Sequence, residues 1–222
     1  MKRDLKIRIW KWIAFVGFSL SLLLGVGVNA QTASELMNRM AEVYKSSGCI
    51  DISASVTVKS VVPENNGKSE FTMLLKGKKF KMDTPEMTVW FDGETQWAYL
   101  KNSEEVNVSL PNSRELISTN PLALMQSYDT FFEVKGKSET VAFNGKGCYK
   151  LQLSPKKEDS IRKMELEIAK DSGLPVAIYV EDKNKTQISI RIGRMKTKQG
   201  CNDSDFVFPE SEYPDAEIID LR

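Results

Sequence analysis

The chain contains no histidine among its 222 residues. This absence removes the commonest general base, the commonest metal ligand and every Ser-His or Cys-His nucleophile pair. A glycine-rich phosphate loop is also missing, because Gly145-Lys146-Gly147 lacks the spacing of a P-loop and predicts a turn. Glu165 and Glu167 share a strand face, which a solvated outer face explains better than an acid/base pair. We therefore expect no catalytic residues and no enzyme activity.

Cysteine is scarce, with only Cys49, Cys148 and Cys201. The three are far apart and form no Cys-x-x-Cys pair, so the sequence predicts neither a metal site nor a cofactor. In an oxidising compartment one disulfide can form, with three possible pairings and one thiol left over. Three small buried or unpaired side chains are an equally good interpretation.

The one long apolar run lies near the N-terminus and spans about 16 residues (13–28), fewer than the roughly 20 that a membrane span needs. Val28-Asn29-Ala30 then places small residues where a signal peptidase cleaves. We expect residues 1–30 to be a cleaved signal peptide and 31–222 to lie outside the cytoplasm without stable membrane anchoring. An uncleaved anchor is the rival interpretation. The run follows a basic start made by Lys2, Arg3, Lys6, Arg8 and Lys11.

The chain has almost no excess of charge, with 31 basic and 30 acidic residues. Removing residues 1–30 takes away five basic side chains and one acidic one, which leaves 26 and 29, a net charge near −3. This balance offers no basic surface for phosphate backbones, so we expect no nucleic-acid binding. The remaining 192 residues suit one domain with a sizeable core, over 31–222.

The domain opens with the pattern of an amphipathic helix. Thr32 followed by Glu35 makes a capping box, and Gly48 stands where a left-handed residue often ends a helix. One helix face is apolar and predicts core packing; it is formed by Leu36, Met37, Met40, Val43 and Tyr44.

From residue 50 the hydrophobic period changes to two, which predicts strands with one wet face. About ten strands follow, among them 131–137 and 140–143, and the only other helical pattern is an apolar insert over 111–129, broken at Asn120-Pro121. We interpret the insert as a lid across the concave face of the sheet; a loop plugging one end of a barrel is the alternative. The fold class expected is mainly β (α+β): a strongly curved antiparallel, unclosed β-barrel with an N-terminal helix and a helical lid over a hydrophobic cavity.

Two strands, 87–91 and 96–100, flank the hairpin signal Asp92-Gly93. Asp-Gly by itself favours a two-residue loop, whereas apolar patterning favours an odd loop. The odd loop would group Met87, Val89 and Phe91 with Trp97 and Tyr99 on the inner face.

The inner face is the candidate ligand site. Eight methionines remain after processing, and flexible methionines suit a surface that must fit different chains. The acyl-chain cavity would be walled by Ile52, Val56, Phe71, Met73, Leu75, Phe80, Met82, Val89, Phe91, Trp97 and Tyr99. The lid would contribute Leu116, Leu122, Leu124 and Met125.

The order of these pieces resembles the LolA-like outer-membrane lipoprotein carrier family over nearly the whole mature chain. The resemblance is carried by residues 71–82 (FTMLLKGKKFKM) and 89–99 (VWFDGETQWAY), by Asn120-Pro121-Leu122 with Leu124, which resembles the family's lid helix, and by 206–209 running to 218–221, which resembles its closing strand. One departure concerns the lid. Family members often have an Arg-Pro pair after the strand's lysine, whereas Lys76 is followed here by Gly77-Lys78-Lys79; Lys78 or Lys79 would have to replace that arginine without its forked geometry.

The resemblance implies a monomeric periplasmic carrier of a Gram-negative envelope. Such a carrier receives lipoprotein acyl chains from an inner-membrane ABC exporter, shields them in its cavity and delivers them to an outer-membrane acceptor. An alternative function on the same fold is an envelope lipid-binding or sensor module that signals through a protein partner. A pull-down from the envelope distinguishes the two, because a carrier recovers many lipoproteins and a sensor one regulatory protein.

Overall fold

The structure, a computed structural model, describes residues 32–222 except 114, 117–127, 158–160 and 199. The expected signal peptide (1–30) and three expected lid residues, Leu122, Leu124 and Met125, lie outside the described residues. The cleavage near Ala30 and the helical lid therefore remain predictions, and so does the single domain expected over 31–222.

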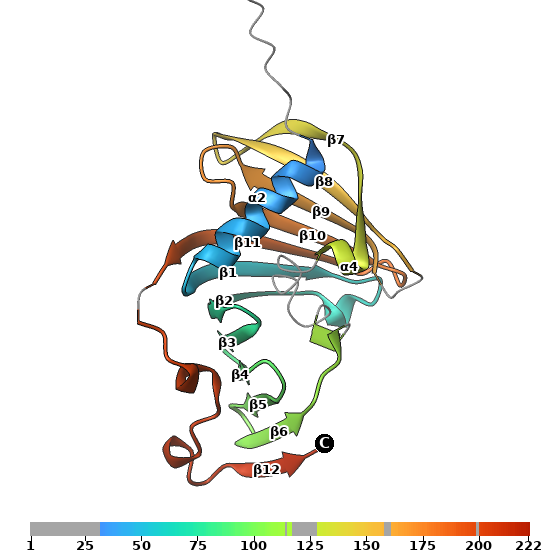
Figure 1. The fold of residues 1–222 in the computed structure, drawn as a ribbon. Coiled ribbons are helices and arrows are strands. Elements are labelled where there is room, and N and C mark those ends of the chain that lie inside the picture. The colour runs from blue at the N-terminus through green and yellow to red at the C-terminus, as the bar shows by residue number, and fades with distance from the viewer. Residues whose placement is uncertain (1–31, 114, 117–127, 158–160, 199) are drawn as a thin grey trace, which may run out of the picture. The chain divides into compact units, whose positions relative to one another are not determined.

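Twelve strands form one sheet in the order β12-β6-β5-β4-β3-β2-β1-β11-β10-β9-β8-β7 (Figure 1). The two end strands do not pair with each other, so the sheet is unclosed, and the expected mainly β, unclosed-barrel class is confirmed. The strands are β1 (Ile50–Lys59), β2 (Gly67–Lys76), β3 (Lys79–Asp83), β4 (Met87–Phe91), β5 (Gln96–Leu100), β6 (Glu105–Ser109), β7 (Phe132–Phe143), β8 (Lys146–Pro155), β9 (Ile161–Ala169), β10 (Pro175–Asp182), β11 (Gln187–Thr197) and β12 (Glu217–Asp220).

Two details differ from the sequence-based expectation. The pairing is antiparallel throughout except at one edge, where β12 runs parallel to β6. The segments expected as two strands, 131–137 and 140–143, form the single strand β7, which absorbs the irregularity as a register shift between Lys135 and Glu139. A bulge of this kind lets one strand follow a bent partner without ending.

Helix α2 (Ala33–Ser46) begins with the expected capping box. The Glu35 backbone N–H donates to Thr32 Oγ1 at 3.2 Å, and the Thr32 N–H donates to Glu35 Oε2 at 2.8 Å. The expected left-handed end at Gly48 is wrong: the C-cap is Ser47 in an extended conformation, and Gly48 has no positive φ. The chain passes directly into β1 at Ile50, so it needs no left-handed turn.

Apolar side chains gather in two clusters. In the larger, the inner cluster, α2 packs on one face of the sheet, where Figure 1 shows it crossing the strands from β8 to β1. Four of the five expected helix residues are buried there with Ala33, and Val43 is half-buried. The smaller, the outer cluster, comprises Trp90, Val106, Val108 and Phe208, with Trp97, Tyr99, Tyr213 and Ala216 packed against it.

The β4–β5 hairpin has a register opposite to the one that patterning favoured. Phe91 pairs with Gln96 and Trp90 with Trp97, so four residues form an even loop. Asp92 holds this turn, because its Oδ1 accepts hydrogen bonds from the N–H groups of Glu94 (2.9 Å) and Thr95 (2.8 Å). Apolar patterning misled because β4 is buried on both faces, and such a strand has no wet side to reveal its register.

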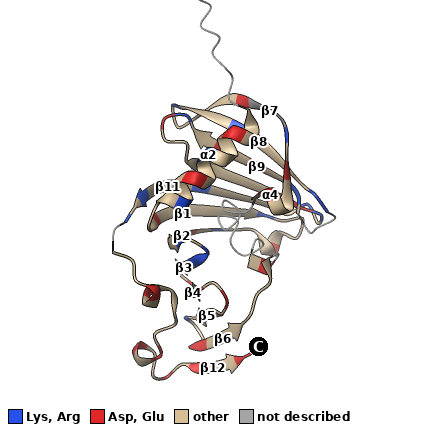
Figure 2. Cartoon of the chain, in the orientation of Figure 1, with Lys and Arg blue, Asp and Glu red and all other residues tan. Residues whose placement is uncertain are grey.

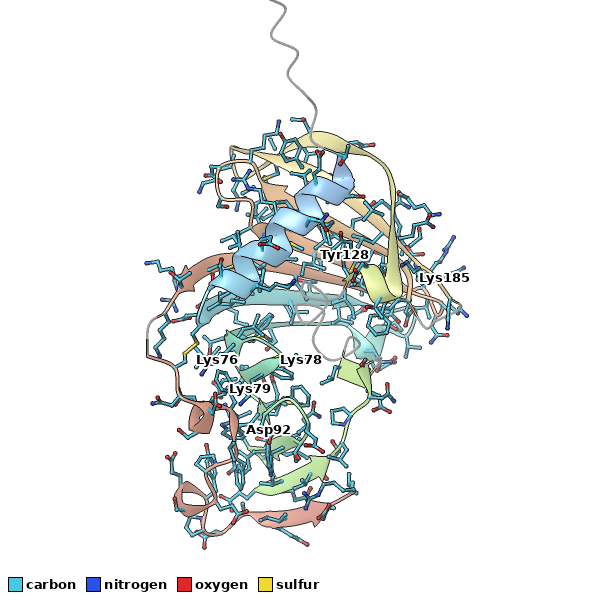
Figure 3. All side chains as sticks on the ribbon, in the orientation of Figure 1. Lys76, Lys78, Lys79, Asp92, Tyr128 and Lys185 are labelled. Carbon is cyan, nitrogen blue, oxygen red and sulfur yellow. A yellow bond between two sulfur atoms is a disulfide. The ribbon has the colours of Figure 1, made fainter. Side chains whose placement is uncertain are left out.

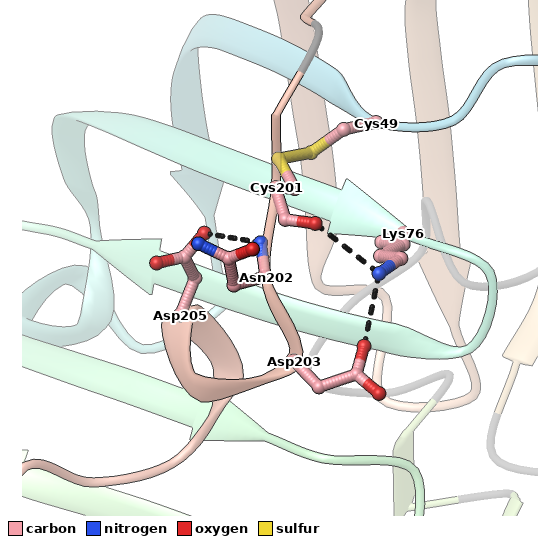
Figure 4. The surroundings of a disulfide bond; sticks show 6 residues. All are labelled: Cys49, Lys76, Cys201, Asn202, Asp203 and Asp205. Atoms are coloured by element: carbon pink, nitrogen blue, oxygen red, sulfur yellow. Dashed lines mark hydrogen bonds and ion pairs between the residues drawn. A yellow bond between two sulfur atoms is a disulfide. The ribbon is translucent and has the colours of Figure 1, made fainter.

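The C-terminal segment (201–221) is joined to the start of β1 by a disulfide between Cys49 and Cys201 (Figure 4). This pairing decides among the three that were open, and Cys148 is a buried free cysteine. The segment contains two short 3-10 helices, η3 (Asp203–Phe206) and η4 (Glu210–Glu212), before β12. Of the segments expected to form the closing strand, only 218–220 lie in one, as part of β12, while Phe206 and Phe208 are buried side chains.

Candidate functional site

The inner cluster places most of the expected wall residues side by side. One row crosses five strands through successive pairs: Ile52 with Met73, Met73 with Met82, Met82 with Val89, and Val89 with Ala98. A parallel row, Ile50, Leu75, Phe80 and Phe91, lies beside it. Antiparallel pairs in register bring their side chains into contact on one face, so the rows make a continuous apolar surface.

The burial of these residues differs along the surface. Ile52, Phe71, Met73, Leu75, Phe80, Val89 and Phe91 are buried in the inner cluster. Val56, Met82 and Leu116 are half-buried and pack against it. Most of the wall is thus covered by the protein's own side chains, and these three residues remain partly accessible.

Trp97 and Tyr99 lie on the other face of the sheet. Both pack against the outer cluster, where the Tyr99 ring lies 4.6 Å from the ring of Tyr213 and Trp90 meets Phe208 at 5.4 Å, edge to face. Their position follows from the even hairpin loop, since a shift of one residue exchanges the two faces of a strand. These two aromatic residues hold the C-terminal segment instead of lining the inner face.

A pocket of about 700 Å³ opens onto the inner cluster. Its size falls in the range of roughly 300–1,000 Å³ that is typical of small-molecule sites. The apolar part of its lining is formed by Leu75, Phe91, Leu110, Pro111, Leu116 and Phe131. Lys45, Lys78 and Glu94 are the charged residues that line it among those described.

Three of the predicted site residues, Leu75, Phe91 and Leu116, therefore reach the pocket itself. Sequence reasoning missed Lys45, Leu110 and Phe131. Lys45 belongs to a helix whose opposite face was the one assigned to the core, and Phe131 lies in the short helix α4 (Tyr128–Phe131) where a strand was expected. The tertiary structure brings these residues together with the β2–β3 and β4–β5 turns, which also line the pocket.

Two bonds hold α2 in place over the inner face. The Tyr128 hydroxyl donates to Asn38 Oδ1 at 2.9 Å and so links α4 to α2 beside the pocket. The buried Tyr44 hydroxyl donates to the Met195 sulfur at 3.6 Å, and its burial raises the pKa of this phenol. Tyr44 therefore stays neutral and packs as an uncharged side chain in the inner cluster.

The lysines of the β2–β3 turn have different positions (Figure 3). Lys76 Nζ lies 2.9 Å from Asp203 Oδ1 and donates to the Cys201 carbonyl at 3.2 Å, while Lys79 Nζ lies 3.0 Å from Asp203 Oδ2. The hydrogen bonds from both lysines lower the pKa of Asp203. Lys79 is thus engaged with the C-terminal segment (Figure 4 shows Lys76 there), and Lys78 lies at the pocket.

A second pocket, of about 600 Å³, crosses β1, β2 and β11. It combines inner-cluster side chains such as Phe71 and Ile192 with four charged residues, Glu70, Asp83, Lys101 and Arg191. Lys101 and the Thr88 hydroxyl both donate to Asp83 Oδ1, at 3.0 and 2.6 Å, so this carboxylate is already hydrogen-bonded. The first pocket has the larger set of apolar lining residues.

Within the described ranges, no group of three or more histidine, cysteine, aspartate or glutamate side chains is arranged to hold a metal ion. None of the described helices has the length and apolar character needed to cross a membrane. What the site offers is an apolar surface with a partly open pocket, which is suited to holding hydrocarbon.

Several solved structures are similar to this chain at low sequence identity. An uncharacterized conserved protein from Thermus thermophilus matches with a TM-score of 0.57 at 12% identity, covering 86% of this chain and 99% of that chain. A DUF1329 family protein from Desulfovibrio piger has a TM-score of 0.49 at 16% identity (81% and 96% covered). A LolA superfamily protein from Nitrosomonas europaea has a TM-score of 0.45 at 12% identity (81% and 99% covered).

The sequence was also compared with curated proteins and with family models. No curated protein matches it. The family model described as "Outer membrane lipoprotein carrier protein LolA" matches residues 26–183, which is well over half of the chain and includes α2 and the strands β1 to β10. The chain therefore belongs to the outer membrane lipoprotein carrier protein LolA family.

Proposed function

We propose that this protein is an exported periplasmic carrier that binds the acyl chains of lipoproteins on its inner face and moves them from the inner to the outer membrane. The observation that carries the proposal is the pocket at the edge of the two apolar rows, with Leu75 and Phe91 in its lining. The family description, which names a lipoprotein carrier, supports it. The proposed partners are lipoproteins, an inner-membrane ABC exporter and an outer-membrane acceptor.

The energetic need for such a carrier is large. Each methylene removed from water contributes about 0.8 kcal/mol, so one long acyl chain left in water costs on the order of 10 kcal/mol. Shielding that chain requires a continuous apolar surface, because every polar group placed against hydrocarbon loses its hydrogen bonds with water. The rows from Ile52 to Ala98 and from Ile50 to Phe91 supply such a surface.

Release requires the opposite property, a site that is stable when empty. Here the wall residues pack against one another and against α2 in the inner cluster. The empty site therefore exposes little apolar surface to water. Met73 and Met82 lie at the centre of the first row, and α2 adds Met37 and Met40. Unbranched methionines change rotamer at low cost, which suits a wall that opens for a guest and closes after it leaves.

Co-purification from cell envelopes tests the proposal. The protein would be isolated from the envelope in mild detergent, and the lipids and proteins that accompany it would be identified by mass spectrometry. We expect several different lipoproteins, each bearing its acyl chains. Recovery of one regulatory protein and no lipoprotein would instead indicate a sensor, and recovery of neither lipid nor lipoprotein would contradict the proposal.

A matched pair of variants ties the result to the pocket. Leu116→Gln adds a polar group to a half-buried residue of the pocket lining. Leu221→Gln makes the same change at a side chain that is 63% exposed in the C-terminal segment. We expect only the first variant to recover less lipoprotein.

A further inference from the structure

The charged residues that line the pocket have a net positive charge. Lys45 comes from the last turn of α2, Lys78 from the β2–β3 turn, and Glu94 from the β4–β5 turn. Among the described lining residues these three carry the only formal charges, so the mouth has an excess of one positive charge. All three side chains are exposed, which leaves the lysine ammonium groups able to move toward a ligand.

Of the three lysines at the β2–β3 turn, Lys78 is the one that lines the pocket. Lys76 and Lys79, on either side of the same turn, share the carboxylate of Asp203, which fixes them to the C-terminal segment. That segment carries seven acidic residues between 203 and 220 and no basic residue in that span, as Figure 2 shows around β12. The acidic segment thus attracts the two lysines whose side chains point toward it, and Lys78 lies at the pocket instead.

Each lysine also has an ordinary explanation. Lys45 in the last helical turn offsets the partial negative charge of the helix C-terminus, and Lys78 is a polar residue in a tight turn that begins at Gly77 (φ 56°). Neither explanation requires the two lysines to line the same pocket. An amphiphile whose hydrocarbon lies on Leu75 and Phe91 would have its head group at this mouth, where lysines are good partners for phosphate.

We infer that the pocket binds an anionic amphiphile, with its hydrocarbon chain against Leu75 and Phe91 and a phosphate head group between Lys45 and Lys78. The ligand class therefore extends beyond lipoproteins to free phosphate-bearing lipids. This inference rests on the proposed function to the extent that the pocket must accept hydrocarbon at all. A binding experiment distinguishes failure of this inference from failure of the proposed function.

Binding is measured by displacement of the neutral fluorescent probe N-phenyl-1-naphthylamine, with dodecyl phosphate and dodecanol as competitors below their aggregation concentrations. The two competitors share one chain and differ in head group. In the unaltered protein at low salt, dodecyl phosphate should bind on the order of tenfold more tightly than dodecanol, because two charge-assisted contacts are added at an exposed mouth. The preference should shrink as salt is raised.

The double variant Lys45→Gln/Lys78→Gln should lose this preference and bind dodecanol as before. Its control, Lys68→Gln/Lys196→Gln, removes two exposed lysines that do not line the pocket and should keep the preference. A preference that persists in the first double variant overturns the head-group assignment while leaving the carrier proposal intact. Failure of both competitors to displace the probe overturns both proposals.

Inorganic phosphate distinguishes a lipid head group from a free anion. Up to the concentration at which dodecyl phosphate saturates the protein, inorganic phosphate should leave dodecyl phosphate binding unchanged, because it lacks the hydrocarbon that supplies most of the affinity. Competition by inorganic phosphate at the same concentration as dodecyl phosphate would show a site for the free ion and overturn the lipid assignment.

Discussion

Tyr128 and Asn38 form the polar link between the two helices that border the inner face. The Tyr128 hydroxyl donates to Asn38 Oδ1 at 2.9 Å across a sequence separation of 90 residues. The link matters for the site because α4 also supplies Thr130 and Phe131 to the pocket. This hydrogen bond thus joins the helix that forms one side of the pocket to α2.

Removing this hydrogen bond should loosen the pocket. Tyr128→Phe keeps the ring and should lower the free energy of unfolding by about 1 kcal/mol, the usual net value of one neutral hydrogen bond. Asn38→Ala should have a similar effect, and the double variant should cost little more than either single one, because both remove the same bond. Urea unfolding of the four proteins measures this, and full additivity would contradict it.

The disulfide should account for much of the stability of the C-terminal segment. Cys49 and Cys201 close a loop of 152 residues, and removing a native disulfide typically costs about 2–5 kcal/mol. Cys49→Ser/Cys201→Ser, or reductant added to the unaltered protein, should lower the urea midpoint. Cys148→Ala is the control, since its thiol is unpaired, and its midpoint should respond to reductant as that of the unaltered protein does.

Asp203 should make stability depend on pH in a defined direction. Its pKa is lowered in the folded protein by hydrogen bonds from Lys76 and Lys79. A lowered folded pKa means that the stabilisation is fully present above the unfolded pKa of about 3.9 and disappears as pH falls through the folded value. Asp203→Asn should therefore unfold at a lower temperature than the unaltered protein at neutral pH, and the difference should close in strong acid.

Asp220 provides the matched control for this pH dependence. Arg222 lowers its pKa to about 2 through side-chain and backbone hydrogen bonds. The two residues are only two apart in the chain, so much of this interaction also forms in the unfolded state and cancels. Asp220→Asn should change the unfolding temperature far less than Asp203→Asn at neutral pH; equal effects would show that the Lys76 and Lys79 contacts are not what stabilises the segment.

Phe208 should be the principal apolar anchor of the C-terminal segment. Its ring meets Trp90 edge to face at 5.4 Å and Tyr213 at 5.2 Å, and it is 5% exposed. Phe208→Ala should lower the free energy of unfolding by about 3 kcal/mol or more, as such truncations do in packed sites. The adjacent Val207→Ala, at a residue that is 40% exposed, should stay within about 0.5 kcal/mol. Chemical unfolding followed by tryptophan fluorescence compares the two.

Affinity for uncharged hydrocarbon should depend on the pocket lining. Leu116→Gln should weaken dodecanol binding roughly fivefold, which corresponds to about 1 kcal/mol and to part of one leucine side chain. Leu221→Gln should bind as the unaltered protein does. An unchanged dodecanol affinity in Leu116→Gln would place the hydrocarbon elsewhere.

Local patterns were reliable where one short segment contains the whole signal. The capping box of Thr32 and Glu35 and the alternation in β1 and β2 were predicted and confirmed, because each depends on residues within a few positions of one another. The left-handed end at Gly48 failed, since the next strand determines the direction of the chain there. The single strand β7 also escaped prediction, because its partner β8 carries it past the irregular stretch.

The amino-acid sequence by itself determined the period of each segment, and with it the mainly β class, the helix α2 and most of the apolar wall. Tertiary structure alone decided which face Trp97 and Tyr99 occupy, which cysteine pairs with Cys49, and that Lys45 and Lys78 border one pocket. The physical reason is that periodicity is set by neighbours along the chain. Registers, disulfides and pocket mouths are set by contacts between segments far apart in sequence, where a shift of one residue exchanges the faces of a strand.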